Sequence, residues 1–450
     1  MPLTPSQYAQ ALLASLNLPN LPVIKDERSA TQLWAQSGGQ WLTGYASSPG
    51  LRCRAPVASA VQGAWLALQA ISDNALGHNS AAHQLIGERA AIAGLGRQGG
   101  VSAGGACRFY RAQDGILALN LARPDDLDLL PAWLEKELPT VTDLKPFIAT
   151  KSCDGLLQRA QLLGLAAARW SPPEQAKVPV NWYSVQHLAV SQVPPRAPRV
   201  VDLSSLWAGP LCGALLADCG ARVVKVESSQ RPDGARFGPS QFYDLLHHNK
   251  QSVAVDFKTG VGRHQLRQLL DWADIVIEAS RPRALQQLGM DAEALVRSRS
   301  EMANQPGKVW LSITGYGRQG PQAEWIAYGD DAGVAAGLAW ACTGEQGPPV
   351  FCADAVADPL TGIHGALAAW AFWQAGGGVV LDTSLFGVSR YCASFSAAKA
   401  DDQPQEPTEQ NRFTVAEPQA RQAKSKAAAL GEHTQTVMAE VTSAQASDKG

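Results

Sequence analysis

Between residues 199 and 390, short apolar runs alternate with stretches that have helical spacing. The runs, which are typical of buried strands, lie at 200–203, 221–227, 252–256, 275–278, 309–313 and 379–382. Pro210 near the start of the first intervening helix and Gly220 at its end match the preferences of helix termini, so 200–227 is predicted to be a βαβ unit. The alternation favours an α/β fold with a doubly wound, parallel, Rossmann-like sheet.

The first half of the chain has a different pattern. Residues 30–95 are rich in Ala and Leu with helical spacing, after a short helix within 1–30. Asp114-Gly115 separates two apolar runs and predicts a hairpin. Leu-rich helices are expected over 125–170, and proline pairs at 172–173 and 194–195 bracket a change of domain. This half therefore predicts a smaller α+β domain preceded by helices.

The last part of the chain is polar. After 379–382 the sequence becomes rich in Gln, Glu and Pro through about residue 424, a composition typical of a linker or a loosely wrapping segment. A final helix is expected to start within 430–438.

A passage near the N-terminus is a degenerate repeat of a passage near residue 350. Thr43-Gly44 leads to Ser59 over 15 positions (59 − 44), and Thr343-Gly344 leads to Asp358 over 14 (358 − 344). The two copies keep their frame but differ at one ionisable position. We therefore expect only the copy with Asp358 to carry chemistry.

Composition narrows the functional classes. The 450 residues are 46% hydrophobic with a net charge of −2, so charge favours neither a nucleic-acid nor a membrane partner. No apolar run reaches the roughly 18 residues that a membrane span needs, and the N-terminus does not have the pattern of a signal peptide. Eight cysteines without a CxxC pair indicate reduced thiols in the cytoplasm. Because the histidines lack ligand spacing, we expect no metal site.

Residues 199–390 resemble the family III CoA-transferases, which include formyl-CoA transferase, carnitine CoA-transferase and α-methylacyl-CoA racemase. The passages that match, in order, are 201–210, 220–227, 249–252, 284–289, 315–317, 347–349, 377–385 and 430–434. Residues 34–70 resemble the stretch around the family's catalytic carboxylate, with Ser59 in its place, and 99–135 resemble the small domain. The chain thus resembles one truncated copy fused to a second.

The resemblance implies a domain organisation. The expected units are a degenerate partial repeat of the catalytic domain (1–95), a small domain with a glycine-rich loop (96–195), a Rossmann-like CoA-binding and catalytic domain (196–395), and a linker and C-terminal tail that returns to the core (396–450). Relatives form interlocked homodimers, so this chain is expected to be a pseudo-dimeric monomer or a homodimer.

The resemblance also implies roles for residues. Asp358 would attack an acyl-CoA thioester, Gly104 and Gly105 would belong to a loop that closes over the site, and Asp330 would lie near the thioester. The residues leave other interpretations open. Asp358 is also a good helix N-cap, Gly104-Gly105 could be a plain turn before a strand, and Asp330-Asp331 could be a solvated pair.

For CoA, the implied contacts are Ser205, Leu206, Trp207, Tyr328 and the cations Lys225, Lys250, Arg281 and Arg283. Phosphates of CoA need cationic partners, although each of these cations could instead be solvated at the surface. Three departures from the family pattern put the CoA pocket in doubt. Residues 205–207 are Ser-Leu-Trp where relatives often carry His-Val-Gln or similar, Ser228 stands where relatives often carry Arg, and an Arg near the position of Gln287 is missing.

We therefore expect a CoA-transferase that moves CoA from an acyl-CoA to a carboxylic acid, with CoA as a substrate and no permanently bound cofactor. The first alternative is an acyl-CoA racemase or isomerase, but the racemases carry a His directly before the acid where this chain has Gly329 or Asp330. The second is a CoA-binding protein that has lost catalysis. His364 and His433 are expected to be structural.

Overall fold

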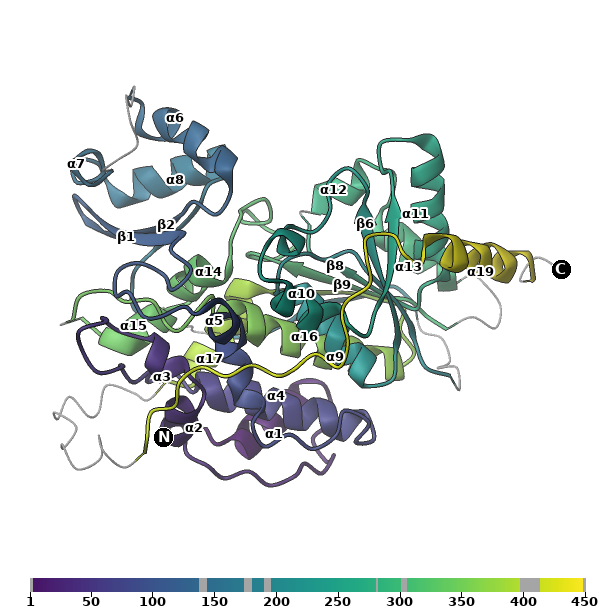
Figure 1. Cartoon of the computed structure of the whole chain (residues 1–450), viewed down its shortest axis with the longest axis horizontal. Helices are drawn as coiled ribbons and strands as arrows, with labels where there is room; N and C mark the ends of the chain where they lie inside the picture. The colour runs from purple at the N-terminus through teal and green to yellow at the C-terminus, as the bar shows by residue number, and fades with distance from the viewer. Residues whose placement is uncertain are drawn as a thin grey trace.

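The computed structural model describes residues 3–136, 144–173, 180–189, 196–280, 282–300, 306–345, 347–396 and 413–447 (Figure 1). Two sheets organise it, one of seven strands and one of three. Within the described residues, no helix has the length and apolar character needed to cross a membrane.

The larger sheet has the strand order β4-β10-β9-β8-β5-β6-β7. Its strands are β4 (Ser184–His187), β5 (Arg199–Asp202), β6 (Arg222–Ser228), β7 (Gln251–Val255), β8 (Ile275–Glu278), β9 (Val309–Thr314) and β10 (Val379–Ser384). All neighbours are parallel except β4, which pairs antiparallel with β10. The predicted parallel α/β sheet is confirmed.

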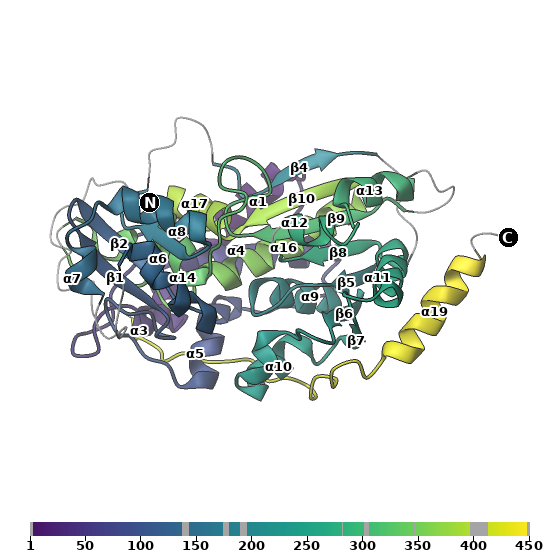
Figure 2. The ribbon, with the colours of Figure 1, turned by 90° about the horizontal axis from the view of Figure 1, so that it is seen from above.

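Helices cover both faces of this sheet (Figure 2). They are α9 (Ala208–Asp218), η3 (Gly234–Phe237), α10 (Ser240–His247), α11 (Gly260–Trp272), α12 (Pro282–Gln286), α13 (Ala292–Ser300), α16 (Ala357–Gln374), α17 (Leu385–Ser394) and α19 (Thr434–Ser447). Alternate strand residues enter different cores: Val200 and Leu311 pack in one, Val201 and Trp310 in the other. Strands buried on both faces explain the continuous apolar runs in the sequence.

The smaller sheet, β1-β2-β3, forms the separate lobe at the upper left of Figure 1. Its elements are β1 (Cys107–Ala112), β2 (Gly115–Asn120), η2 (Pro124–Leu129), α6 (Leu130–Leu134), α7 (Lys145–Ile148), α8 (Cys153–Leu163) and β3 (Ala166–Arg169). The predicted hairpin is confirmed, with Ala112 opposite Gly115. The prediction of helix through 170 is wrong at its end, because Gly164 caps α8 in a left-handed conformation and the chain then pairs with β2 as β3.

Helices dominate the N-terminal segment: α1 (Pro5–Ser15), α2 (Ala30–Gln36), α3 (Gly39–Leu42), α4 (Val57–Ile71), η1 (Ala82–Gly87) and α5 (Glu88–Ala93). The sequence repeat is also structural. Helix α3 leads through Thr43-Gly44 into α4, just as α15 (Leu338–Thr343), preceded by α14 (Gly329–Ala335), leads through Gly344 into α16. Helices α4 and α16 pack against each other, so the two copies meet within one chain.

Two predictions about the domain limits need correction. The polar linker was expected to start after 382, but α17 is a helix whose Val388 and Cys392 are fully buried. Strand β4 precedes the predicted domain boundary at 195 and yet belongs to the larger sheet. Its sequence, Ser-Val-Gln-His, is mostly exposed, as expected of an edge strand, and therefore lacks an apolar signal.

The described part of the tail runs in an extended path from the N-terminal helices past α9 and α10 to α19, drawn in yellow in Figures 1 and 2. Ala416 N–H donates to Ala35 O at 2.8 Å, and Arg421 forms an ion pair with buried Glu88. Ala427 N–H donates to Asp244 at 2.8 Å. The tail therefore joins the N-terminal segment to the larger domain.

Candidate functional site

Asp358 lies in the first turn of α16, where it remains partly exposed. The N-cap of this helix is Val356, so the alternative prediction of Asp358 as the N-cap is wrong. The Asp358 carboxylate instead accepts a hydrogen bond from the backbone N–H of Ala208, the first residue of α9. The positive end of the α9 dipole thus faces this carboxylate.

Two opposing influences set the pKa of Asp358. Burial of its carboxylate, together with the negative charges of Asp330 and Asp354, raises the pKa to about 7, against the lowering effects of Arg89 and the Ala208 N–H. Asp358 therefore exchanges its proton near neutral pH, unlike an ordinary surface aspartate.

Arg89, from α5 in the N-terminal segment, is the cation of this site. Its guanidinium donates two hydrogen bonds to the carboxylate of Asp354, and the one from Nε to Oδ2 is 2.8 Å long. The guanidinium carbon also lies 5.6 Å from the centre of the Trp207 ring. Arg89 therefore joins the N-terminal segment to the loop before Asp358 and to the loop before α9.

The backbone around Asp354 is strained. Ala353 and Ala355 have φ angles of 54° and 44°, a region that L-residues with a side chain adopt at a cost. Hydrogen bonds hold them there: Ala353 N–H donates to the Thr43 hydroxyl and Ala355 N–H to Asp330, each at 2.9 Å. The loop that leads to Asp358 is thus fixed by partners from distant parts of the chain.

Helix α14 brings two more acids to the site. Burial, followed by the charge of Asp354, raises the pKa of Asp330 to about 6, and burial raises that of Asp331 to about 7. Asp331 accepts from Asn120 Nδ2 at 2.9 Å and from Tyr328 N–H at 3.0 Å, so Tyr328 sits at the start of this helix. Both acids are buried, which excludes the alternative of a solvated loop pair.

The glycine-rich loop reaches the same place. A Cβ atom added at Gly104 would lie 3.1 Å from Arg89 Nη2, and the Ser102 side chain hydrogen-bonds to Asp330. Gly105 has a φ of 83°, as a turn glycine does, and a Cβ atom added there would have no neighbour within 4 Å. The loop of the first copy therefore contacts Arg89 and Asp330, whose charges both act on Asp358. Ser59 is fully buried in α4.

The predicted CoA contacts of the 205–207 loop follow β5, beside the point where the strand order reverses between β5 and β8. Ligands of open α/β sheets bind in the crevice at the carboxyl ends of such strands. Ser205 and Leu206 are exposed there, while Trp207 is buried and packs against Phe242. The loop is thus suitably placed for a ligand.

The predicted arginines follow β8, on the other side of this reversal. Arg283 is exposed, lies 3.5 Å from Glu324 and lines an open cleft of about 660 Å³ that also includes Gly164 and Trp325. Arg281 lies outside the described residues.

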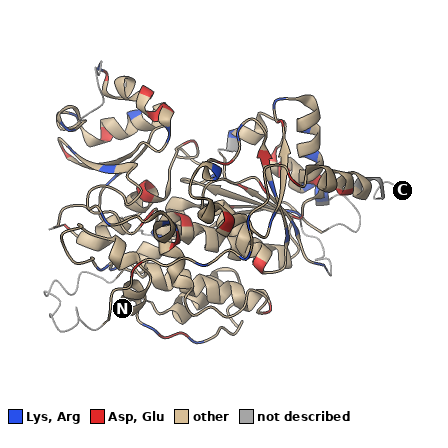
Figure 3. Ribbon diagram, viewed as in Figure 1, with Lys and Arg blue, Asp and Glu red and all other residues tan. Residues whose placement is uncertain are grey.

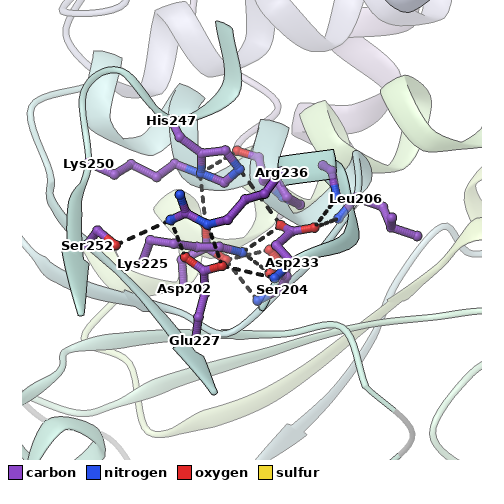
Figure 4. Close-up of polar contacts among 12 residues, drawn as sticks. Asp202, Ser204, Leu206, Lys225, Glu227, Asp233, Arg236, His247, Lys250 and Ser252 are labelled. Carbon is purple, nitrogen blue, oxygen red and sulfur yellow. Dashed lines mark hydrogen bonds and ion pairs between the residues drawn. The ribbon is translucent and has the colours of Figure 1, made fainter. Parts of the chain in front are cut away.

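Lys225 and Lys250 are buried rather than surface cations, and both belong to the network of polar contacts drawn in Figure 4. The Lys225 ammonium is buried against Asp233 at 3.0 Å, and that of Lys250 against Asp202 at 2.8 Å. Acidic and basic residues are interspersed elsewhere along the chain as well (Figure 3). The structure therefore supports neither interpretation of these two lysines: they are not free to contact a phosphate, and they are not solvated at the surface. Because Asp233 also accepts from Leu206 N–H at 3.0 Å, the Lys225 pair fixes the loop after β5.

His364 and His433 form internal hydrogen bonds, which agrees with the expectation that both are structural. His364 donates from Nδ1 to Leu360 O at 2.7 Å and accepts from the Tyr8 hydroxyl at 3.1 Å, and burial lowers its pKa to about 4. His433 Nδ1 accepts from Ser252 N–H at 3.2 Å and so fixes the start of α19.

Sequence reasoning missed Arg89, Asp354, Thr43 and Ser102. Arg89 and Asp354 are 265 positions apart, so no local spacing could connect them. The one available signal was Asp354 itself, a second acid close before Asp358 in an otherwise apolar stretch.

Comparison with known proteins supports the resemblance. The family model described as CoA-transferase family III matches residues 198–447. An acyl-CoA transferase of Fusarium pseudograminearum is 30% identical over 241 residues, which cover 48% of this chain and 52% of that protein. A succinyl-CoA–D-citramalate CoA-transferase of Chloroflexus aurantiacus is 34% identical over 190 residues, covering 40% and 46%.

A solved CaiB/BaiF family protein from Brucella suis has a TM-score of 0.38 at 30% identity, covering 45% of this chain and 55% of that one. The chain spans about half the length of the curated relatives that it matches. The matched region covers the whole larger sheet from β5 onward, with Asp358 inside it. The chain belongs to CoA-transferase family III.

Proposed function

We propose that this chain transfers CoA from an acyl-CoA thioester to a carboxylic acid, with Asp358 as the covalent nucleophile. The observation that carries the proposal is the contrast among four neighbouring acids. Asp330, Asp331 and Asp354 are buried, whereas Asp358 remains partly exposed beside the N-terminus of α9. The exposure of the Asp358 residue supports its carboxylate as the one that a substrate reaches.

The proposed reaction has four steps. An oxygen of Asp358 attacks the thioester carbonyl, the C–S bond breaks, and CoA thiolate leaves behind an acyl–aspartyl anhydride. The thiolate attacks the aspartyl carbonyl and releases the donor acid. The acceptor carboxylate then attacks the resulting aspartyl-CoA thioester, which frees CoA thiolate and gives a second anhydride. Attack of the thiolate on the acceptor's acyl carbon yields the new acyl-CoA and restores the Asp358 carboxylate.

The surroundings of Asp358 suit this chemistry. Arg89 and the Ala208 N–H stabilise the carboxylate form that must attack, and burial leaves this carboxylate less solvated than that of a surface acid. The anhydride has to be protected from water, and the approach of Gly104 to Arg89 supports the loop with Gly104 and Gly105 as the segment that covers it. Asp330 supports the backbone before Asp358 through Ala355.

For CoA, we propose the crevice between the loops that follow β5 and β8. Ser205 and Leu206 supply exposed backbone and side chains there, Trp207 forms the floor, and Tyr328 lies at the start of α14. Arg283 is the candidate partner for a phosphate, because its guanidinium is exposed in the adjoining cleft. Arg281 remains a candidate from sequence alone.

The two repeat copies supply one Asp358 and one glycine loop, so we propose one site per chain in a pseudo-dimeric arrangement, with a homodimer of such chains as the alternative. The eight free cysteines suit a reducing compartment, and we expect the cytoplasm.

A turnover assay tests the proposal. Relatives are described as transferases of succinyl-CoA or formyl-CoA, with D-citramalate, glutarate or oxalate as acids, so these compounds form the first panel. We expect a new acyl-CoA, detected by mass spectrometry, that requires both donor and acceptor. Exchange of the α-proton in deuterated water without an acceptor would favour a racemase instead. CoA binding without turnover across a broad panel of acyl-CoAs and acids would favour a CoA-binding protein that has lost catalysis.

A further inference from the structure

Three cysteines from separate parts of the chain meet beside the candidate site. The Sγ atoms of Cys53, Cys342 and Cys352 all lie within 4.8 Å of one another, and those of Cys53 and Cys352 are 4.0 Å apart. This cluster cannot be recognised from the sequence, because its members form no local motif and two of them are about 300 positions from the third.

The internal repeat explains how two of these thiols meet. Cys53 stands six positions before Ser59 (59 − 53), and Cys352 stands six positions before Asp358 (358 − 352). They are therefore equivalent residues of the two copies, which face each other where the copies pack. Cys342, from α15, completes the cluster on the side of the second copy.

The geometry suits one metal ion better than a disulfide. Tetrahedral zinc with Zn–S bonds of about 2.3 Å places its sulfurs about 3.8 Å apart, so a shift of roughly 1 Å or less converts this cluster into three ligands. A disulfide would use two of the thiols and leave the third unused. Cys352 is buried while Cys53 and Cys342 are partly exposed, so an ion can enter from their side.

The charge of such a site would be compensated. Three thiolates and a divalent ion carry a net charge of −1. The Arg54 guanidinium lies next to Gly344, just beyond Cys342, with its Nη2 2.8 Å from a Cβ built at that glycine. Arg54 is held there by hydrogen bonds to the carbonyls of Trp340 and Ala341.

We propose that Cys53, Cys342 and Cys352 bind one soft, thiophilic divalent cation of the Zn²⁺ or Cd²⁺ class, with water in the fourth position. Binding would release three thiol protons to solvent, because thiolates are the ligands. The ion would tie the N-terminal segment to the loop that leads, through Asp354, to Asp358. Its role would be to hold the two copies together, and it would take no part in the transfer reaction.

Titration of the reduced full-length protein with Cd²⁺ tests the proposal. We expect an ultraviolet sulfur-to-cadmium charge-transfer band that saturates at one ion per chain. In Cys342→Ser, which alters a partly exposed ligand, the affinity should fall at least tenfold. The matched control is Cys153→Ser, a buried cysteine of the small domain, which should bind as the unaltered chain does.

A second measurement needs no variant. Alkylation of the native protein with iodoacetamide, with and without one equivalent of Cd²⁺, is followed by peptide mapping. We expect Cd²⁺ to protect Cys53 and Cys342, the two partly exposed ligands, together. The absence of a charge-transfer band, an unchanged affinity in Cys342→Ser, or protection of other cysteines instead would each overturn the proposal.

Discussion

The guanidinium of Arg89 pairs with the carboxylate of Asp354, four positions before Asp358, and so places a cation from the first repeat copy at the acid of the second. The same guanidinium lies against Gly104 and near Trp207. One side chain thus connects the glycine loop, the loop before α9 and the strained turn before α16. If Asp358 is the nucleophile, Arg89 is a positioning residue that also sets the fraction of Asp358 that is ionised.

Variants of this pair should move the pH dependence of turnover in opposite directions. Arg89→Met removes the charge that lowers the Asp358 pKa, so the midpoint of the rise in kcat/KM should move to higher pH. Asp354→Asn removes a charge that raises this pKa, so the midpoint should move to lower pH. The measurement is kcat/KM from pH 5 to 9.

Arg89→Met should also destabilise the protein. The substitution leaves Asp354 buried without its ion-pair partner, at a cost of about 3–5 kcal/mol in the free energy of unfolding. Arg89→Lys retains the charge and provides the control: it should fold, with a midpoint close to that of the unaltered chain. Shifts of the same sign in Arg89→Met and Asp354→Asn would contradict this electrostatic role.

Asp358 should also make stability depend on pH. Its folded pKa of about 7 is above that of an exposed aspartate, so its contribution to stability is present below about pH 4 and is lost as the pH rises through 7. Asp358→Asn stays neutral and should exceed the unaltered chain in the free energy of unfolding at pH 8 by roughly 1–4 kcal/mol, with little difference at pH 4. Urea unfolding at the two pH values measures this.

The control for that comparison is Asp128→Asn, which alters an exposed acid of the small domain and should change stability by no more than about 0.5 kcal/mol at either pH. A gain in Asp358→Asn that is equally large at pH 4 and pH 8 would show that the substitution acts through packing rather than through ionisation.

The glycine loop can be tested by adding one methyl group. In Gly104→Ala the new Cβ would press on Arg89 Nη2 at 3.1 Å, whereas in Gly100→Ala its nearest neighbour, a carbonyl oxygen, is 4.0 Å away. We expect kcat to fall at least tenfold in Gly104→Ala, because Arg89 must shift, and to change less than twofold in Gly100→Ala. Equal effects of the two substitutions on kcat would count against a contact between this loop and the site.

Thr43 supports the strained turn from the first copy. Thr43→Val keeps the shape of the side chain but removes the acceptor of the Ala353 N–H, so it should destabilise the protein by about 1–3 kcal/mol and lower kcat. Thr442→Val, in the exposed part of α19, is the matched control, with an expected change within about 0.5 kcal/mol. Thermal unfolding with a parallel turnover assay separates the two variants.

The fold was predictable where burial leaves a strong pattern. Strands β5 and β9 are largely buried and mostly apolar because helices cover both faces of the sheet. Edge strand β4 lacks this signal because it is mostly exposed, and the Ala-rich β3 looks helical because its strand state depends on pairing with β2. Tertiary contacts decide both elements.

The site was predictable only in part. The repeat frame and the family resemblance single out Asp358 and the loop with Gly104, but they cannot show that Arg89 faces Asp354. The sequence also could not show which cations are buried. Lys225 and Lys250 were candidate contacts for phosphate, but both lie in internal ion pairs. Sequence patterns report periodicity along the chain, and these relationships arise between distant segments.

Covalent labelling of Asp358 is the most direct test of the central claim. The unaltered chain and Asp358→Asn are incubated with each acyl-CoA of the panel and quenched with hydroxylamine, and their peptides are mapped by mass spectrometry. We predict a hydroxamate at Asp358 in the unaltered chain, dependent on acyl-CoA, and none in the variant. Modification of a different residue, or no modification while CoA still binds, would contradict the assignment of Asp358 as the nucleophile.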